Sequence, residues 1–189
     1  MTPLQRRALL LAPLGLAAIG GSAMWVLLAR LNDGGYDPHA VPDPMVGKPV
    51  PRFSLPGLGA GPGFTSAELV KHAPLLLNFF ASWCLPCAQE ATELMKLKQR
   101  GLPIWGVVYK DKPEAAAGFL KQNGNPYRRV AVDQPGLTAI DFGLYGVPET
   151  YLIDKHGILR WRWAGGLSST VVRDWLDPRL KTYARELLS

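Results

Sequence analysis

The chain alternates between continuous apolar runs and segments of helical periodicity. Two apolar runs, Pro74–Ala81 and Pro103–Tyr109, have the length and composition of buried central strands, and Tyr127–Asp133 predicts a third. The segments between them, Cys87–Gly101 and Lys112–Gly124, carry apolar residues at helical spacing, and each ends at a glycine. The pattern therefore predicts an order of strand, helix, strand, helix, strand.

The remaining pattern predicts a hairpin and a closing helix. Glu149–Asp154 and Ile158–Ala164 are strand-like and are separated by a short turn that contains a glycine. Ser168–Leu188 has helical character, and we expect this helix to be broken near Pro178. Together these elements predict an α/β fold with a central mixed sheet flanked by helices.

An uninterrupted apolar segment precedes this alternation. Ala8–Ala29 holds 22 residues without a charged side chain, enough for a helix to cross a bilayer core of about 30 Å. It is longer than the apolar region of a cleaved signal peptide, which has about 7–15 residues. Because of this length we expect residues 1–30 to form an uncleaved anchor, and Arg6 and Arg7 favour a cytoplasmic N-terminus. In a bacterium this would be a single pass through the inner membrane, with the rest of the chain in the periplasm.

The chain after the anchor has the composition of a tether and a single domain. Residues 31–50 are rich in Gly, Pro and Asp and are predicted to be the tether, and residues 51–189 are predicted to form the domain. The apolar fraction of 48% argues against disorder. The net charge of +6 comes from scattered Lys and Arg without a dense run, which argues against nucleic-acid binding.

The two cysteines of the chain, Cys84 and Cys87, carry the candidate chemistry. Structural zinc needs four ligands, and His39, His72 and His156 have no ligand spacing, so we expect no metal. A disulfide that closes a two-residue loop removes little chain entropy and braces the fold weakly. A CxxC pair beside a βαβ pattern is instead typical of a thioredoxin-like redox site.

The position of the pair predicts a role for each cysteine. Cys84 follows a buried strand and opens a helix, where the helix dipole and free N–H groups lower a thiol pKa below its usual value of about 8.5. We expect Cys84 to be the exposed attacking thiol and Cys87, one turn further, to be the buried resolving thiol. Trp83 is expected to cover the sulfurs and to offer a flat apolar contact to a substrate.

Two segments resemble thioredoxin-fold proteins: FFASWCLPC resembles their active-site strand and helix, and GVPETYLID (Gly146–Asp154) resembles the loop that faces it. This resemblance implies that Pro148 is cis and lies against the disulfide, and that Val147 offers its N–H and C=O to a bound peptide. The alternative for Pro148 is an ordinary trans proline that opens a strand. Tyr145 is expected either to line the groove that would hold this peptide or to pack in the fold.

A longer resemblance covers about Gly47 to Leu180. GNPY (124–127) and YGVPETYLID, together with the anchor, resemble the membrane-anchored CcmG/DsbE proteins of cytochrome c maturation. The resemblance implies a periplasmic reductant for the haem-attachment cysteines of apocytochrome c or for a maturation partner. It also implies electrons from a DsbD- or CcdA-type membrane protein, and no cofactor besides the Cys84–Cys87 disulfide.

The chain departs from general thioredoxins at Asn78, where they carry a buried aspartate that can take a proton from the second cysteine. An acid three residues after that cysteine is characteristic of CcmG proteins, and Glu90 stands there. Glu149 is the other candidate base for Cys87. The alternatives are a solvated acid in the first helical turn for Glu90 and a loop carboxylate that accepts backbone N–H groups for Glu149.

Three functions remain open from the sequence. The first is the CcmG/DsbE-like reductase, and the second is a TlpA/ResA-like reductase that serves a copper site or oxidase assembly. Both use the same catalytic residues, so only the client distinguishes them. The third is a non-catalytic thioredoxin-fold binding module, whose function would survive replacement of both cysteines by serine.

Overall fold

The computed structural model describes residues 20–22, 24–26 and 44–185 of the 189-residue chain. The chain divides into two units, Met1–Val41 and Pro42–Ser189. In the first unit the described residues are helical and exposed, and the rest of the predicted anchor lies outside the described residues. No helix within the described ranges is long and apolar enough to cross a membrane.

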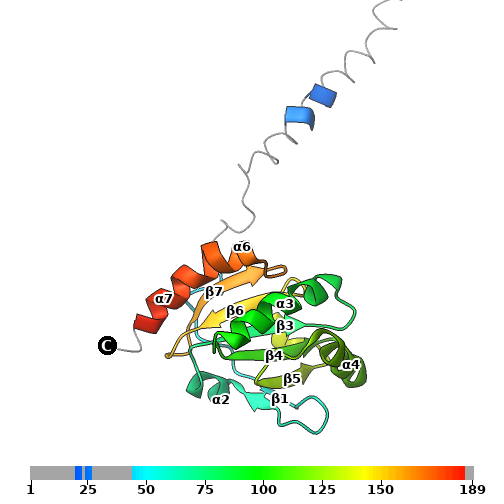
Figure 1. Ribbon diagram of the computed structural model, residues 1–189, viewed down its shortest axis with the longest axis vertical. Coiled ribbons are helices and arrows are strands. Elements are labelled where there is room, and N and C mark those ends of the chain that lie inside the picture. Colours follow the sequence, from blue (N-terminus) through cyan, green and yellow to red (C-terminus); the bar gives the residue numbers. More distant parts are fainter. Residues whose placement is uncertain (1–19, 23, 27–43, 186–189) are drawn as a thin grey trace, which may run out of the picture. The chain divides into compact units, whose positions relative to one another are not determined.

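The second unit contains a five-stranded mixed sheet with the strand order β5-β4-β3-β6-β7 (Figure 1). The parallel strands are β3 (Leu75–Phe80), β4 (Ile104–Tyr109) and β5 (Arg129–Asp133). β6 (Glu149–Ile153) runs antiparallel to β3 and forms a hairpin with β7 (Leu159–Ala164). The hydrophobic pattern therefore located all five strands of this sheet, since buried strands read as apolar runs.

Helices cover both faces of the sheet and enclose two apolar cores. α3 (Leu85–Gln99) and α4 (Pro113–Asn123) pack on one face, together with the C-terminal helical segment. α2 (Ser66–Lys71) and α5 (Leu137–Asp141) pack on the other. α3 and α4 agree with the predicted helices, whereas α2 and α5 are too short to show a helical period in the sequence.

A small second sheet pairs β1 (Ser54–Leu55) with β2 (Phe64–Thr65). The segment before β1 runs along the β6–β7 hairpin. The N–H groups of Gly47 and Val50 donate to carbonyls of this hairpin at 2.7 and 2.8 Å. The last residues of the predicted tether are thus hydrogen-bonded to the domain, while residues 31–43 lie outside the described residues.

The start of α2 carries a capping box that the sequence reveals as T-x-x-E. Thr65 Oγ1 accepts from the Glu68 N–H at 3.2 Å, and the Glu68 carboxylate accepts from the Thr65 N–H at 3.0 Å. We expect Thr65→Ala to lower the free energy of unfolding by about 1 kcal/mol, because the Glu68 N–H loses the side-chain oxygen that accepts it. Urea unfolding measures this loss. Thr170→Ala, at an exposed position of α6 (Ser169–Val171), is the control, and an equal loss there would contradict the cap.

The predicted break at Pro178 is wrong. After α6 the chain continues as a π-helical segment, η1 (Val172–Leu176), and then as α7 (Asp177–Arg185). The N–H of Asp177 bonds the carbonyl of Val172, five residues earlier, and Asp177 keeps helical dihedrals (φ −59°, ψ −39°). Pro178 thereby falls in the first turn of α7, where a missing N–H is tolerated.

Candidate redox site

Cys84 and Cys87 form a disulfide at the start of α3, directly after β3. Cys84 is the N-cap residue, with extended dihedrals (φ −93°, ψ 105°), and its Sγ accepts the N–H of Cys87 at 3.1 Å. The predicted placement of Cys84 at a helix N-terminus is confirmed. In the reduced protein the same N–H and the helix dipole would stabilise a thiolate at this position.

The expected exposure of Cys84 is wrong for this disulfide form. Cys84 is only 4% exposed and Cys87 is 2% exposed. The carbonyl oxygen of Val147 lies 3.4 Å from Cys84 Sγ, so the loop before β6 packs against the attacking sulfur. The sequence predicts that Cys84 lies at a helix end, but it does not reveal that Val147, 63 residues further along the chain, covers it.

The loop that faces the disulfide has the predicted conformation at its centre. The Val147–Pro148 peptide bond is cis, which rules out the alternative of a trans proline. Pro148 is buried and Val147 is half-buried. The Val147 carbonyl, expected to serve a bound peptide, here faces Cys84.

Two aromatic side chains near this loop are exposed. Trp83 is 60% exposed, and its Nε1 donates to the Lys110 carbonyl at 3.4 Å, which ties the indole to the end of β4. Trp83 is therefore a surface residue, and its covering of the sulfurs stays a prediction. Tyr145 is 82% exposed, with the Arg162 guanidinium 4.2 Å from its ring centre, so it does not pack in the core.

Glu90 is buried on the same side of α3 as Cys87, three residues further along the helix. It is 1% exposed, so the alternative of a solvated acid is wrong. Its carboxylate accepts the Asn78 Nδ2 at 3.0 Å and the Leu167 N–H at 2.9 Å. Burial raises the pKa of Glu90 from 4.5 to about 7, against the opposing effect of these two hydrogen bonds.

Glu149 lies on the opposite face of the sheet. In the β3–β6 register Glu149 pairs with Phe79, whose side chain belongs to the α2/α5 core, whereas Thr150 pairs with Asn78 beside Glu90.

The Glu149 carboxylate is ion-paired with Arg162 and accepts the Tyr151 hydroxyl. Burial raises the pKa of Glu149, although the contacts with Arg162 and Tyr151 oppose this effect.

The Redoxin family model matches residues 45–174. The DsbE thiol:disulfide interchange protein of Escherichia coli K12 is 38% identical over 97% of this chain and 98% of its own length. The chain belongs to the CcmG/DsbE family. A second relative, the thiol:disulfide interchange protein HelX of Rhodobacter capsulatus, is 43% identical over 76% of this chain and 82% of its own.

A solved structure gives the same result for the fold. The thiol-disulfide oxidoreductase of Bacteroides fragilis covers 70% of this chain and 100% of its own, with a TM-score of 0.59 and 27% identity. The fold is thioredoxin-like. With its CxxC disulfide at the predicted helix N-terminus, this CcmG/DsbE-family protein is a thiol:disulfide oxidoreductase.

Sequence reasoning missed the side chains that support Glu90 in this CcmG/DsbE-family site. In the sequence, Asn78 stands out only as an amide at the position where general thioredoxins carry an aspartate. Its Oδ1 accepts the Tyr127 hydroxyl at 2.6 Å, while its Nδ2 donates to Glu90 and, at 2.9 Å, to Thr150 Oγ1. Tyr127 stands in GNPY, so the signal was present in the sequence as a motif without an assigned role.

A groove of about 460 Å³ reaches Glu90 from the surface between the start of α3 and the segment after β7. Its lining residues are Pro86, Gln89, Glu90, Glu93, Gly166, Leu167, Ser168 and Ser169. Glu90 thus lies beside a surface groove although its side chain is buried. In the described part of the chain, no three His, Cys, Asp or Glu side chains gather as metal ligands would.

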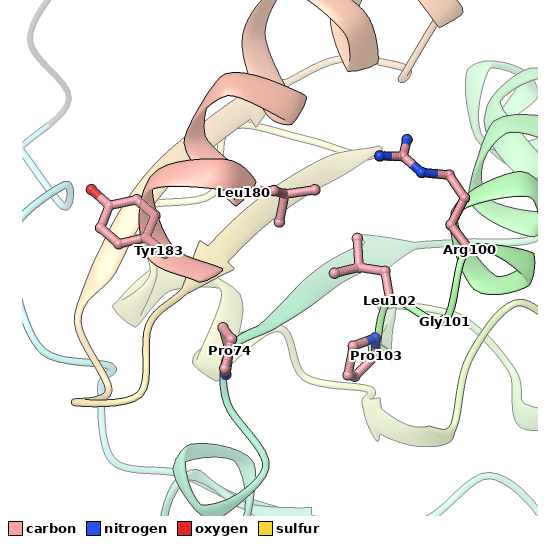
Figure 2. Close-up of a pocket in the computed structure, with 7 residues that line it drawn as sticks. All are labelled: Pro74, Arg100, Gly101, Leu102, Pro103, Leu180 and Tyr183. Atoms are coloured by element: carbon pink, nitrogen blue, oxygen red, sulfur yellow. The ribbon is translucent and has the colours of Figure 1, made fainter. Parts of the chain in front are cut away.

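A second pocket, of about 280 Å³, lies away from this site (Figure 2). Figure 2 shows Leu180 and Tyr183 of α7 across from the turn that contains Leu102. Pro74 and Pro103, which also line the pocket, directly precede β3 and β4, whereas the disulfide follows the other end of β3. This pocket therefore contributes nothing to the redox site.

Proposed function

We propose that this protein reduces disulfides of apocytochrome c haem-attachment cysteines, or of a cytochrome c maturation partner, in the bacterial periplasm. The observation that carries the proposal is the disulfide at the start of α3 with a buried Glu90 three residues after Cys87. Kinship with DsbE and HelX supports it.

The reaction transfers two electrons from the reduced cysteine pair to the client disulfide. The Cys84 thiolate attacks one client sulfur, a mixed disulfide forms, and the other client sulfur leaves as a thiolate that takes a proton from water. Cys87 then loses its proton and attacks Cys84 Sγ, which releases the second client sulfur as a thiolate that takes a proton from water and leaves the Cys84–Cys87 disulfide. The pair itself carries the electrons, so the proposed chemistry uses no cofactor.

Glu90 is the proposed proton acceptor for Cys87. It lies on the disulfide's face of the sheet, its pKa of about 7 suits a base near neutral pH, and a surface groove lies beside it. Glu149 is on the other face and already neutralises Arg162, which argues for a structural role.

Client recognition is proposed to use the loop before β6. Val147 would pair with the client backbone through its N–H and C=O, as an added strand does, once the client displaces the carbonyl contact with Cys84. Pro148 shapes this loop. The exposed rings of Trp83 and Tyr145 would add apolar contact at either side.

The proposed location is the inner membrane, with Ala8–Ala29 as a single-pass anchor and the catalytic domain in the periplasm. After each turnover the disulfide must be reduced again. We propose a DsbD- or CcdA-type membrane protein as the electron donor.

The test is a trapping experiment with Cys87→Ala in the full-length protein. Cys84 can still attack, but the mixed disulfide cannot resolve, so acid quenching is expected to hold the client covalently. Mass spectrometry should identify apocytochrome c or a CxxC-bearing maturation partner. Cys84→Ser is the matched control and should trap nothing.

Other outcomes decide against the proposal. A trapped copper chaperone or oxidase subunit would replace it with a reductase for that client. An empty trap, combined with function retained in the Cys84→Ser/Cys87→Ser protein, would establish a non-catalytic binding module instead.

A further inference from the structure

The GNPY segment forms a turn that aims Tyr127 into the core. α4 ends at Asn123, and Gly124 follows it with a positive φ of 90°, a conformation that favours glycine. The Asn125 side chain accepts the Tyr127 N–H at 3.0 Å, and the Asn125 carbonyl accepts Lys98 Nζ of α3 at 2.8 Å. The turn is therefore fixed both internally and to the helix that carries the cysteines.

Packing fixes the Tyr127 ring independently of its hydroxyl. The ring stacks on Phe80 with centroids 4.9 Å apart, and Tyr127 is 7% exposed. It also lies over Gly106 of β4, where an added Cβ would come within 2.8 Å of the ring. A phenylalanine at position 127 can therefore keep the same place, so the hydroxyl can be removed without disturbing the ring.

The hydroxyl reaches the redox site through one amide. An asparagine side chain has one acceptor oxygen and two donor hydrogens. Because the Tyr127 hydroxyl donates to the oxygen at 2.6 Å, the nitrogen faces the Glu90 carboxylate at 3.0 Å and Thr150 at 2.9 Å. A reversed amide would set its oxygen against an ionised Glu90.

We propose that Tyr127 is a positioning residue for Glu90: its hydroxyl sets the orientation of the Asn78 amide, and the amide holds the Glu90 carboxylate. This inference rests on the proposed role of Glu90 as proton acceptor. The Tyr127–Asn78–Glu90 chain connects the loop after α4, the middle of β3 and the helix that carries the disulfide. It gives a physical reason for an amide at position 78, since a carboxylate there would face Glu90 with like charge.

The test is the titration of Glu90 in the full-length oxidised protein, where the cysteines do not titrate. Carboxyl carbon NMR on ¹³C-glutamate protein would follow the signal that Glu90→Gln removes. We expect Tyr127→Phe to raise the Glu90 pKa by about half a unit to one unit, because the hydrogen bond that favours the ionised form weakens. Tyr151→Phe removes a buried hydroxyl on the opposite face and is expected to leave the Glu90 pKa unchanged.

A double-variant cycle strengthens the test. Asn78→Ala should raise the Glu90 pKa at least as much as Tyr127→Phe, and Tyr127→Phe should add no further shift in that background. An unchanged Glu90 pKa in Tyr127→Phe, or equal shifts in Tyr127→Phe and Tyr151→Phe, would overturn the inference. The titration involves no client, so its result is independent of the trapping experiment that tests the proposed function.

Discussion

Glu90→Gln is expected to slow the resolution of the mixed disulfide by about 100-fold above pH 7, the usual size of a general-base contribution. Cys87 must lose a proton before it attacks Cys84 Sγ, and glutamine cannot accept that proton. In the wild type the resolution rate should rise with pH through about 7, the pKa of Glu90, and this limb should be absent in the variant. Acid-quenched single turnovers with a peptide that carries a CxxCH disulfide measure both effects.

As the pH rises above 4.5, the stability of Glu90→Gln relative to the wild type should increase, whereas its resolution rate relative to the wild type should decrease. Folded Glu90 keeps its proton up to about pH 7, whereas the unfolded chain loses it near 4.5. The folded state therefore binds more protons in this window, and wild-type stability falls as the pH rises through it. The shift in the Glu90 pKa corresponds to at most about 3 kcal/mol of unfolding free energy. The wild type should lose this stability between pH 4.5 and pH 8, whereas the variant should not.

Glu93→Gln is the matched control for Glu90→Gln. Glu93 lies three residues further along α3 and lines the same groove, but its carboxylate pairs with the exposed Lys96 at 2.7 Å. We expect nearly wild-type resolution and an unchanged pH profile. A similar loss in both glutamine variants would show that groove charge, and not proton transfer by Glu90, controls the rate.

Arg162→Met is expected to lower the free energy of unfolding at neutral pH by about 3–5 kcal/mol. The side chains of Arg162 and Glu149 are 4% and 0% exposed, so the variant leaves a buried carboxylate without its cation. It also removes the donor to the Gly143 carbonyl, which Arg162 Nη2 meets at 2.9 Å. Urea unfolding at pH 7 measures the loss.

Two comparisons make the ion-pair prediction specific. The double variant Arg162→Met/Glu149→Leu should recover most of the stability, because no unpaired charge remains in the core. Arg160→Met on the same strand should cost clearly less, since Asp154 keeps backbone N–H donors from His156 and Ile158 at 2.9 and 2.8 Å. If Arg160→Met were as damaging as Arg162→Met, burial of the pair would not explain the effect.

The elements that the sequence predicted well are those whose signal is local. The buried strands read as apolar runs such as Pro74–Ala81, and α4 begins at Pro113 and ends beside Gly124. The two cysteines lie at a helix N-terminus because a strand ends and a helix begins within a few residues of them. The helix passes Pro178 without a break because the π-helical turn η1 precedes it and leaves the proline in the first turn of α7, which the apolar pattern does not indicate.

The choice between the two candidate carboxylates shows where sequence information ends. Glu90 and Glu149 are both acids close to a recognised motif, and nothing local separates them. The pairing of β3 with β6 places Thr150 beside Asn78 and Glu149 beside Phe79, on opposite faces. Since successive strand residues point to opposite faces, a register shift of one residue would exchange them.

By itself, the sequence determined the strand pattern, the family resemblance, and the redox pair at its helix N-terminus, because each depends on residues close together in the chain. Only the tertiary structure decided which acid lies on the disulfide's face, that Val147 covers Cys84, and that Tyr127 reaches Asn78 across 49 residues. These contacts depend on strand register and packing, which no local pattern encodes.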